Sequence, residues 1–166
     1  ASVIAPAAAS IVLPYLAKSR QQAMMMQGMN NLRQIGKEQK QSTPAHTGAM
    51  PPDLGSLLQY VQAPAAFLTP DHAQKMMAPA NAKPDELAKW VTENSDYVYL
   101  GKDFGKLTKI TNPAQTIIAY EKFEAVKNGL VSVLFADGHV ELVKLESLWS
   151  YYWHLDWQAS AVAQGH

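Results

Sequence analysis

The pair Asp137-Gly138 lies between two apolar runs, in the stretch LVSVLFADGHVELVK that covers Leu130–Lys144. An Asp-Gly pair in this setting predicts a β-hairpin, because a two-residue type I′ turn needs positive φ at both of its central residues. With these two residues as the loop, four pairs lie opposite one another: Ala136 with His139, Phe135 with Val140, Leu134 with Glu141, and Val133 with Leu142. The stretch therefore predicts an antiparallel sheet with a defined register.

This register predicts one apolar and one mixed face of the hairpin, because successive side chains of a strand point to opposite sides. The apolar face would hold Val131, Val133, Phe135, Val140 and Leu142. The mixed face would hold Ser132, Leu134, His139, Glu141 and Val143. We therefore expect one side of the sheet to lie on a hydrophobic core. The best candidate to cover it is the helix that starts the chain.

Ser2–Gln41 is predicted to form one long helix, because Ala, Leu, Met, Gln, Lys and Arg dominate it. At about 1.5 Å per residue it would run roughly 60 Å. Apolar residues in its second half recur at helical spacing and are expected to face the sheet: Met25, Met29, Leu32 and Ile35. Pro6 and Pro14 are expected to kink or locally unwind the helix, since each lacks a backbone N–H donor.

Ala1–Leu16 is expected to behave differently from the rest of this helix, because it carries no charged side chain. Its large apolar residues point in several directions: Val3, Ile4, Ile11, Val12, Leu13 and Leu16. A segment that is apolar all round must be buried on all sides, in a membrane or among other helices. One sheet can cover only one side of it. We therefore expect Ala1–Leu16 to protrude from the domain or to pack against another copy of the chain.

The remaining chain alternates short helices with strands. Predicted helices are Leu54–Val61, capped by Asp53, and a longer one that opens at Pro84, Asp85 and Glu86 and runs to Asn94. Predicted strands are Asp96–Leu100 and Thr116–Lys122. The segment Ala63–Pro84 is expected to be irregular, with one turn near Ala73–Met77. The last segment, Glu146–Gln158, is expected to form a helix or an aromatic cap. The fold class is therefore α+β, with a long N-terminal helix on an antiparallel sheet of about four strands. Residues 1–41 form the helix and residues 42–166 the globular head.

The composition narrows the kinds of partner and chemistry that the chain can have. The 166 residues carry 14 basic and 14 acidic side chains, and charged residues are only 17% of the chain. A neutral chain with few charges argues against nucleic acid as the main partner and favours self-association. With no cysteine, neither disulfides nor thiol chemistry are possible. Because the chain does not begin with Met and opens on a short apolar stretch, we expect a processed or trimmed remnant of a longer apolar segment.

Catalytic and metal-binding signals are weak. The chain has no phosphate loop, no nucleophile elbow and no zinc-ligand spacing. Asp137, His139 and Glu141 form a D-x-H-x-E run in which His139 and Glu141 share a face, so a metal site is sterically conceivable. The turn explains Asp137 more simply, because short polar side chains tolerate the left-handed region. We therefore expect no catalytic residue, no metal and no cofactor.

An aromatic group near the C-terminus is the more interesting candidate surface. It consists of Trp149, Tyr151, Tyr152, Trp153 and Trp157. Aromatic residues at this density either close a core or form a contact patch for a partner or a neighbouring subunit. Closing the core would use about two of the five, so the others are a possible partner patch.

LFADGHVELV resembles the C-terminal signature of the prepilin-type processing-associated H-X9-DG family of type IV pilin-like proteins. LPYLAKSRQQAMMMQGMNNLRQIG resembles the family's amphipathic N-terminal helix, and MPPDLGSLLQYV, AFLTPD, DYVYLGK and TIIAYEK resemble its middle blocks. The likeness covers most of Ile11–Lys144. The chain departs from the family at two positions: the signature His would fall at Lys127, and the usual Cys is Thr69.

This resemblance implies a pilin-like or pseudopilin-like structural subunit of a type IV pilus-related filament or a type II secretion pseudopilus. It implies a leader peptide and a cleavage site before Ala1, an inner-membrane precursor, and later a periplasmic, cell-surface or extracellular filament. Partners would be other copies or related subunits, through the N-terminal helix. The alternative is a cell-surface or periplasmic binding module with the same fold, which recognises carbohydrate or protein through its aromatic C-terminus.

Overall fold

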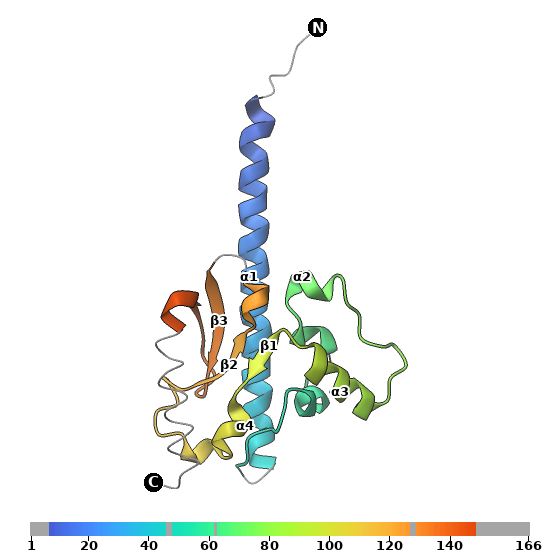
Figure 1. Ribbon diagram of the computed structural model, residues 1–166, viewed down its shortest axis with the longest axis vertical. Coiled ribbons are helices and arrows are strands. Elements are labelled where there is room, and N and C mark those ends of the chain that lie inside the picture. The colour runs from blue at the N-terminus through green and yellow to red at the C-terminus, as the bar shows by residue number, and fades with distance from the viewer. Residues whose placement is uncertain (1–6, 46–47, 62, 127–128, 149–166) are drawn as a thin grey trace.

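The computed structural model describes residues 7–45, 48–61, 63–126 and 129–148, with backbone alone for 7–13 and 41–45. Its first element, α1 (Ala7–Ala45), is a single helix of 39 residues. Figure 1 shows that the N-terminal part of α1 extends beyond the rest of the molecule, whereas its C-terminal part lies inside it. The helix runs unbroken through Pro14, so local unwinding, one of the two effects predicted there, is wrong, and Pro6 lies outside the described residues.

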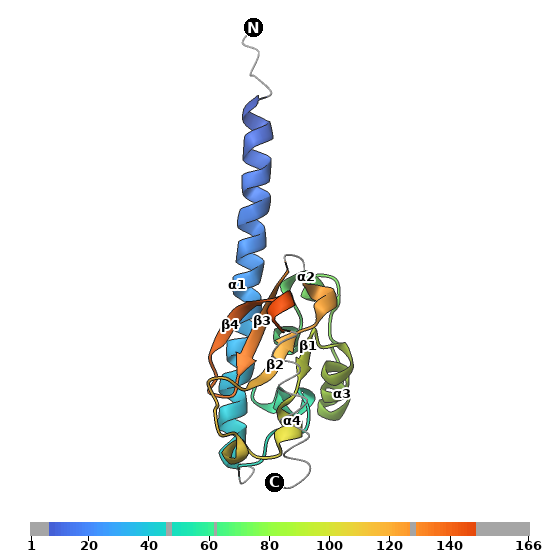
Figure 2. The same cartoon turned by 60° about the vertical axis from the view of Figure 1, so that its left-hand side comes forward.

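Four strands form one antiparallel sheet in the order β1-β2-β3-β4. They are β1 (Tyr97–Tyr99), β2 (Ile117–Glu121), β3 (Leu130–Phe135) and β4 (Val140–Lys144). The prediction of an α+β chain, with a long N-terminal helix on an antiparallel sheet of about four strands, is confirmed. Figure 2 shows the strands side by side across the docked part of α1.

α1 lies against β3 because its inward face is apolar and closely fitted. Met29, Leu32 and Ile35 are buried in the main hydrophobic core, as their helical spacing predicted. Gly36 permits the closest approach, since a Cβ at this position would lie only 2.6 Å from Leu134 Cδ1. The second half of α1 is thus part of the core of the domain.

The hairpin between β3 and β4 has a different register from the predicted one. Leu134 pairs with Val140, and the Phe135 N–H donates to the His139 carbonyl at 3.0 Å, so the loop holds three residues, from Ala136 to Gly138. Gly138 has φ of 90°, the positive value expected of it. A three-residue loop needs positive φ only at its last position, which removes the demand on Asp137 that a type I′ turn would make.

The one-residue shift changes which side chains of β4 share a face with β3. Val140 and Leu142 lie with Leu134 on the side of α1, not with Val133 as predicted. The other side is also covered. There, a second buried cluster holds Ile117, Tyr120, Val131, Val133, Phe135 and Leu148. The expectation of a single core-facing side is therefore wrong, and β3 is buried on both faces.

The connecting elements are short, apart from one helix. α3 (Pro84–Asn94) begins and ends at the predicted residues. The predicted helix after Asp53 is a 3-10 turn, η1 (Gly55–Gln59), in which the Asp53 carboxylate accepts the Ser56 N–H at 2.8 Å. The segment expected to be irregular contains η2 (Pro64–Phe67) and α2 (Pro70–Ala73). The other short elements are α4 (Gly101–Phe104), η3 (Leu107–Lys109) and η4 (Phe123–Ala125).

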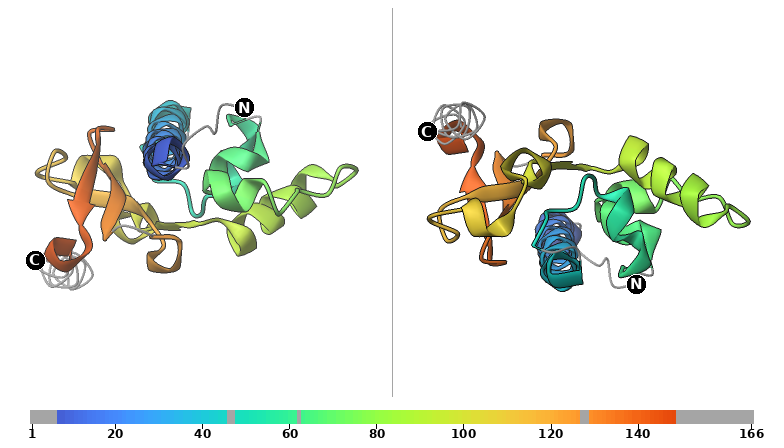
Figure 3. Two further views of the ribbon diagram at one scale, coloured as in Figure 1. Left: turned by 90° about the horizontal axis from the view of Figure 1, so that it is seen from above. Right: turned by 90° about the horizontal axis from the view of Figure 1, so that it is seen from below.

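Figure 3, a view down the long axis, shows α1 with the β3-β4 hairpin on one side and α2 on the other. Two polar contacts hold this second side in place. The Asn31 amide donates to the Leu68 carbonyl at 3.1 Å, and the Tyr97 hydroxyl donates to the Gly28 carbonyl at 3.4 Å. They position the segment before α2, and the start of β1, against α1.

Candidate binding pocket beside the docked helix

A cavity of about 320 Å³ opens where α1 leaves the domain. One wall is α1 itself, with Met25 and Gly28; another is α2 and the residues before it. The sheet contributes Glu121, Ser132 and Leu142, all from the side that faces α1. α1, α2 and three strands of the sheet, all far apart in the sequence, thus contribute to the pocket.

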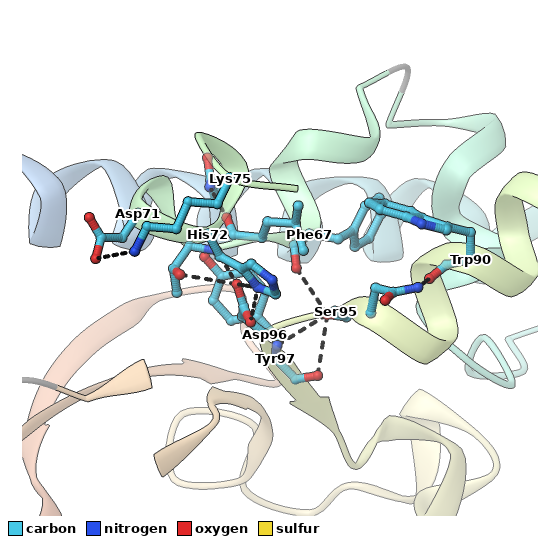
Figure 4. A network of polar contacts seen from close by, with 12 residues as sticks. Phe67, Asp71, His72, Lys75, Trp90, Ser95, Asp96 and Tyr97 are labelled. Carbon is cyan, nitrogen blue, oxygen red and sulfur yellow. Dashed lines mark hydrogen bonds and ion pairs between the residues drawn. The ribbon is translucent and has the colours of Figure 1, made fainter. Parts of the chain in front are cut away.

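Asp96 is the polar centre of the wall that α2 forms. Its carboxylate accepts the Thr69 N–H at 2.7 Å and the Thr69 hydroxyl at 3.0 Å. Nδ1 of His72 lies 2.8 Å from its other oxygen (Figure 4). Because an ionised carboxylate can only accept, the His72 Nδ1 carries the hydrogen and donates it. The three residues therefore bind α2 to the start of β1 across 27 and 24 positions of sequence.

Backbone contacts around Ser95 reinforce this wall. The Asp96 N–H donates to the Phe67 carbonyl at 3.0 Å, and the Ser95 hydroxyl lies 3.1 Å from the same oxygen. The buried Ser95 oxygen also accepts the Tyr97 N–H at 3.1 Å. Figure 4 shows these contacts meeting between β1 and the chain before α2. The wall is therefore held by hydrogen bonds and forms independently of any ligand.

Glu121 is the carboxylate that the sheet adds to the pocket. Burial raises the pKa of the Glu121 carboxyl above its ordinary value, and the nearby charge of Asp96 raises it further, whereas hydrogen bonds with Ser132 act to lower it. The raised pKa means that the site supplies too little positive charge or water to stabilise the ionised carboxylate fully. A hydrogen-bond donor or a cation placed in the pocket would stabilise the ionised form of Glu121.

The lining carries more negative than positive side chains. Four carboxylates line it, from Asp71, Asp96, Glu121 and Glu124, against the ammonium groups of Lys75 and Lys122. Lys75 lies 3.9 Å from Asp71 and is largely exposed. Among the residues that the structure describes, no group of three or more His, Asp or Glu side chains is placed to hold a metal ion. The pocket offers charge and hydrogen-bond acceptors without a metal-ligand cluster.

The predicted turn residues lie at the tip of the hairpin, away from this pocket. His139 bridges two acids there, with Nδ1 on the Asp137 carboxylate and Nε2 at 3.4 Å from Glu141 Oε1. Its ring stacks on Phe135 with centroids 4.3 Å apart, and the Lys40 ammonium donates to the Asp137 carbonyl. The His139 contacts are local to the hairpin, whereas the Lys40 contact ties the turn to α1, so the D-x-H-x-E run serves the hairpin and its attachment to the helix.

The electrostatics of Asp137 follow from these contacts. Slight burial acts to raise the pKa of its carboxyl, but hydrogen bonds from His139 and the charges of His139 and Lys40 outweigh it, so the pKa lies below the ordinary value. The Asp137 carboxylate also accepts the His139 N–H at 3.1 Å. Its carboxylate fixes the turn through these contacts, whereas the predicted reason for Asp137, tolerance of the left-handed region, is not required in a three-residue loop.

The other predicted contact residues are only partly covered by the structure. Leu16 lies in the protruding part of α1 and is 56% exposed. Ile11, Val12 and Leu13 belong to α1, where the backbone alone is described, and Val3 and Ile4 lie outside the described residues. Also outside them are Lys127 and the aromatic group Trp149, Tyr151, Tyr152, Trp153 and Trp157.

The sequence pattern does not indicate the polar residues of the pocket. Thr69 stands where the resembled family has a Cys, and Asp96 and Glu121 carry no signal beyond their places in the predicted strands. The one available signal was the run Thr69-Pro70-Asp71-His72, whose Pro at the first helical position marks a helix start. That Asp96 meets this helix start could not be read from sequence, because the contact joins residues 27 positions apart.

No family model, no curated protein and no solved structure matches this chain. Over the described residues, no helix combines the length and the apolar character that a membrane span needs.

Proposed function

We propose that the chain is a pilin-like or pseudopilin-like structural subunit of a type IV pilus-related filament or a type II secretion pseudopilus. Its role would be mechanical, with no bond chemistry. It would be made as an inner-membrane precursor and would then assemble into a periplasmic, cell-surface or extracellular filament. The sequence resemblance described above motivates this proposal.

The observation that supports it best is the division of α1. The second half is the core partner of the sheet, with Leu32 and Ile35 fully buried. In the first half, the large side chains that the structure describes lie open, with Tyr15 71% and Leu16 56% exposed. An apolar helical segment that the domain does not cover favours a helix-rich partner surface, and other copies of the same helix supply one.

The experiment compares exposed apolar residues inside and outside this segment. Tyr15→Asp and Leu16→Asp would each place a charge on the protruding part of α1, whereas Met77→Asp, at a residue 84% exposed elsewhere, is the matched control. Sedimentation velocity and electron microscopy should show self-association of the wild-type chain and of Met77→Asp. We expect the two α1 variants to remain monomeric with unchanged circular dichroism.

Two results would count against the filament role. One is a wild-type chain that stays monomeric at high concentration. The other is assembly that tolerates charge at both Tyr15 and Leu16. The alternative role, a binding module that uses the aromatic group at 149–157, stays a prediction because these residues lie outside the described part of the chain.

A further inference from the structure

We propose that the pocket between α1, α2 and the sheet binds a small organic cation, a primary ammonium group carried on an apolar body. This ligand site is separate from the filament role. It uses residues of the head domain, whereas the proposed assembly contacts lie on the protruding part of α1.

The size and construction of the pocket suit a small molecule. Its volume of about 320 Å³ falls at the lower end of the range typical of ligand sites. Hydrogen bonds from Thr69 and His72 to Asp96 fix one wall, and the sheet fixes another. A ligand would therefore meet a site that is already formed, and little ordering would oppose its binding.

The charge of the lining selects a cation. Asp96 precedes Tyr97, which pairs with Glu121 across β1 and β2, and the Lys122 N–H donates to the Asp96 carbonyl at 2.8 Å, so both acids lie at one end of this strand pair and line the pocket. Glu121 has neutral Ser132 as its hydrogen-bond partner, so its charge is not balanced there. Of the two ammonium groups in the lining, that of Lys75 lies 3.9 Å from the Asp71 carboxylate. An ammonium group would donate to the carboxylates and relieve their repulsion, while a carboxylate or phosphate would add to it.

The apolar part of the lining selects an organic rather than an inorganic cation. Met24 and Met25 come from α1, and Val126, Leu130 and Leu142 from the sheet and the segment between β2 and β3. Methionine side chains are flexible and polarisable, so they adapt to ligands of irregular shape. A hydrated metal ion would gain nothing from these groups, whereas an aliphatic or aromatic body would be removed from water against them.

Isothermal titration calorimetry of the full chain with three matched probes tests the proposal. The probes are 2-phenylethylamine, its neutral analogue 2-phenylethanol and the anionic 3-phenylpropionate. We expect the amine to bind at least tenfold more tightly than the alcohol, and 3-phenylpropionate not to bind.

Two variants and one control locate the site. Glu121→Gln should weaken binding of the amine at least tenfold, and Met24→Trp should abolish it by filling the cavity. Glu141→Gln, at an exposed residue of the hairpin, should leave binding unchanged. Circular dichroism melts identify any variant that fails to fold, and Met24→Trp provides the second test if Glu121→Gln is unstable.

Four results would overturn the proposal. They are equal affinity for the amine and the alcohol, tighter binding of 3-phenylpropionate, amine binding that survives both pocket variants, and no binding of millimolar amine to the folded chain. None of these results bears on filament assembly, which the α1 variants test separately.

Discussion

Gly138 is the residue on which the hairpin turn depends. Its φ of 90° lies in the region that side chains other than glycine rarely adopt, and a Cβ there would lie 2.9 Å from the Lys40 side chain. We expect Gly138→Val to lower the free energy of unfolding by about 1 kcal/mol or more. Urea denaturation followed by circular dichroism measures it. Gly138→Asn should cost less, because Asn tolerates the left-handed region, and equal losses in the two variants would contradict this explanation.

Glu121 predicts a pH dependence of stability. Because burial raises its pKa in the folded chain, the folded state holds this proton more tightly than the unfolded state does. The contribution of Glu121 to the free energy of unfolding should therefore fall as pH rises from the unfolded-state pKa, about 4.3, through the raised folded value. In Glu121→Gln this fall should be absent. Parallel denaturation curves between pH 4 and 8 would test it, and identical pH profiles for the two proteins would refute it.

The sequence predicted the turn glycine, Gly138, but not the pairing register of β3 and β4. Two-residue and three-residue hairpin loops both place a glycine in the left-handed region, so Asp137-Gly138 is compatible with either. The apolar pattern could not decide, because β3 is buried on both faces and therefore shows no clean alternation. Val131 and Val133 looked like one core face, but Leu134 lies in the larger core on the other.

The helix α1 contains both buried and exposed apolar residues, so substitutions in this one element can be compared directly. Leu32→Asp would place a charge in the core against the sheet and should unfold the domain. Met26→Asp, one and a half turns away at a residue 56% exposed, should change the free energy of unfolding by less than about 0.5 kcal/mol. Thermal melts of the two variants make the comparison. A folded Leu32→Asp variant would show that the contact between α1 and β3 does not stabilise the domain.

Elements with local signals were predictable, and those fixed by distant contacts were not. α3 begins at Pro84 because Pro suits the first helical position and Glu86 caps the backbone N–H of Lys83 at 3.0 Å. α2 has only four residues, and its position depends on Asp96. The pocket shares this property, since its walls come from segments that only the folded chain brings together. Sequence alone therefore predicted the layout of helix and sheet but not the site.

For the molecule as a whole, loss of the protruding segment should leave the thermal stability of the domain nearly unchanged. Of residues 1–16, which this deletion removes, the structure describes the side chains of Pro14, Tyr15 and Leu16, which are exposed and belong to neither buried cluster. We therefore expect the melting temperature to change by less than about 2 °C, which for a chain of this size corresponds to less than 1 kcal/mol. Calorimetry of the shortened chain measures it. A large drop in melting temperature would mean that Ala1–Leu16 contributes to the core of its own domain.

The continuity of α1 also determines how the domain would respond to tension. The helix runs without a break from its open end into the core, so a pull along its axis reaches the head without an intervening hinge. Met29, Leu32 and Ile35 lie along the pulled helix within the core, and they would be loaded in shear together rather than one after another. Shear loading shares the force among contacts, whereas peeling concentrates it on one. The same geometry that places the protruding part of α1 outside the domain would therefore also make the head domain resist being pulled away from this helix.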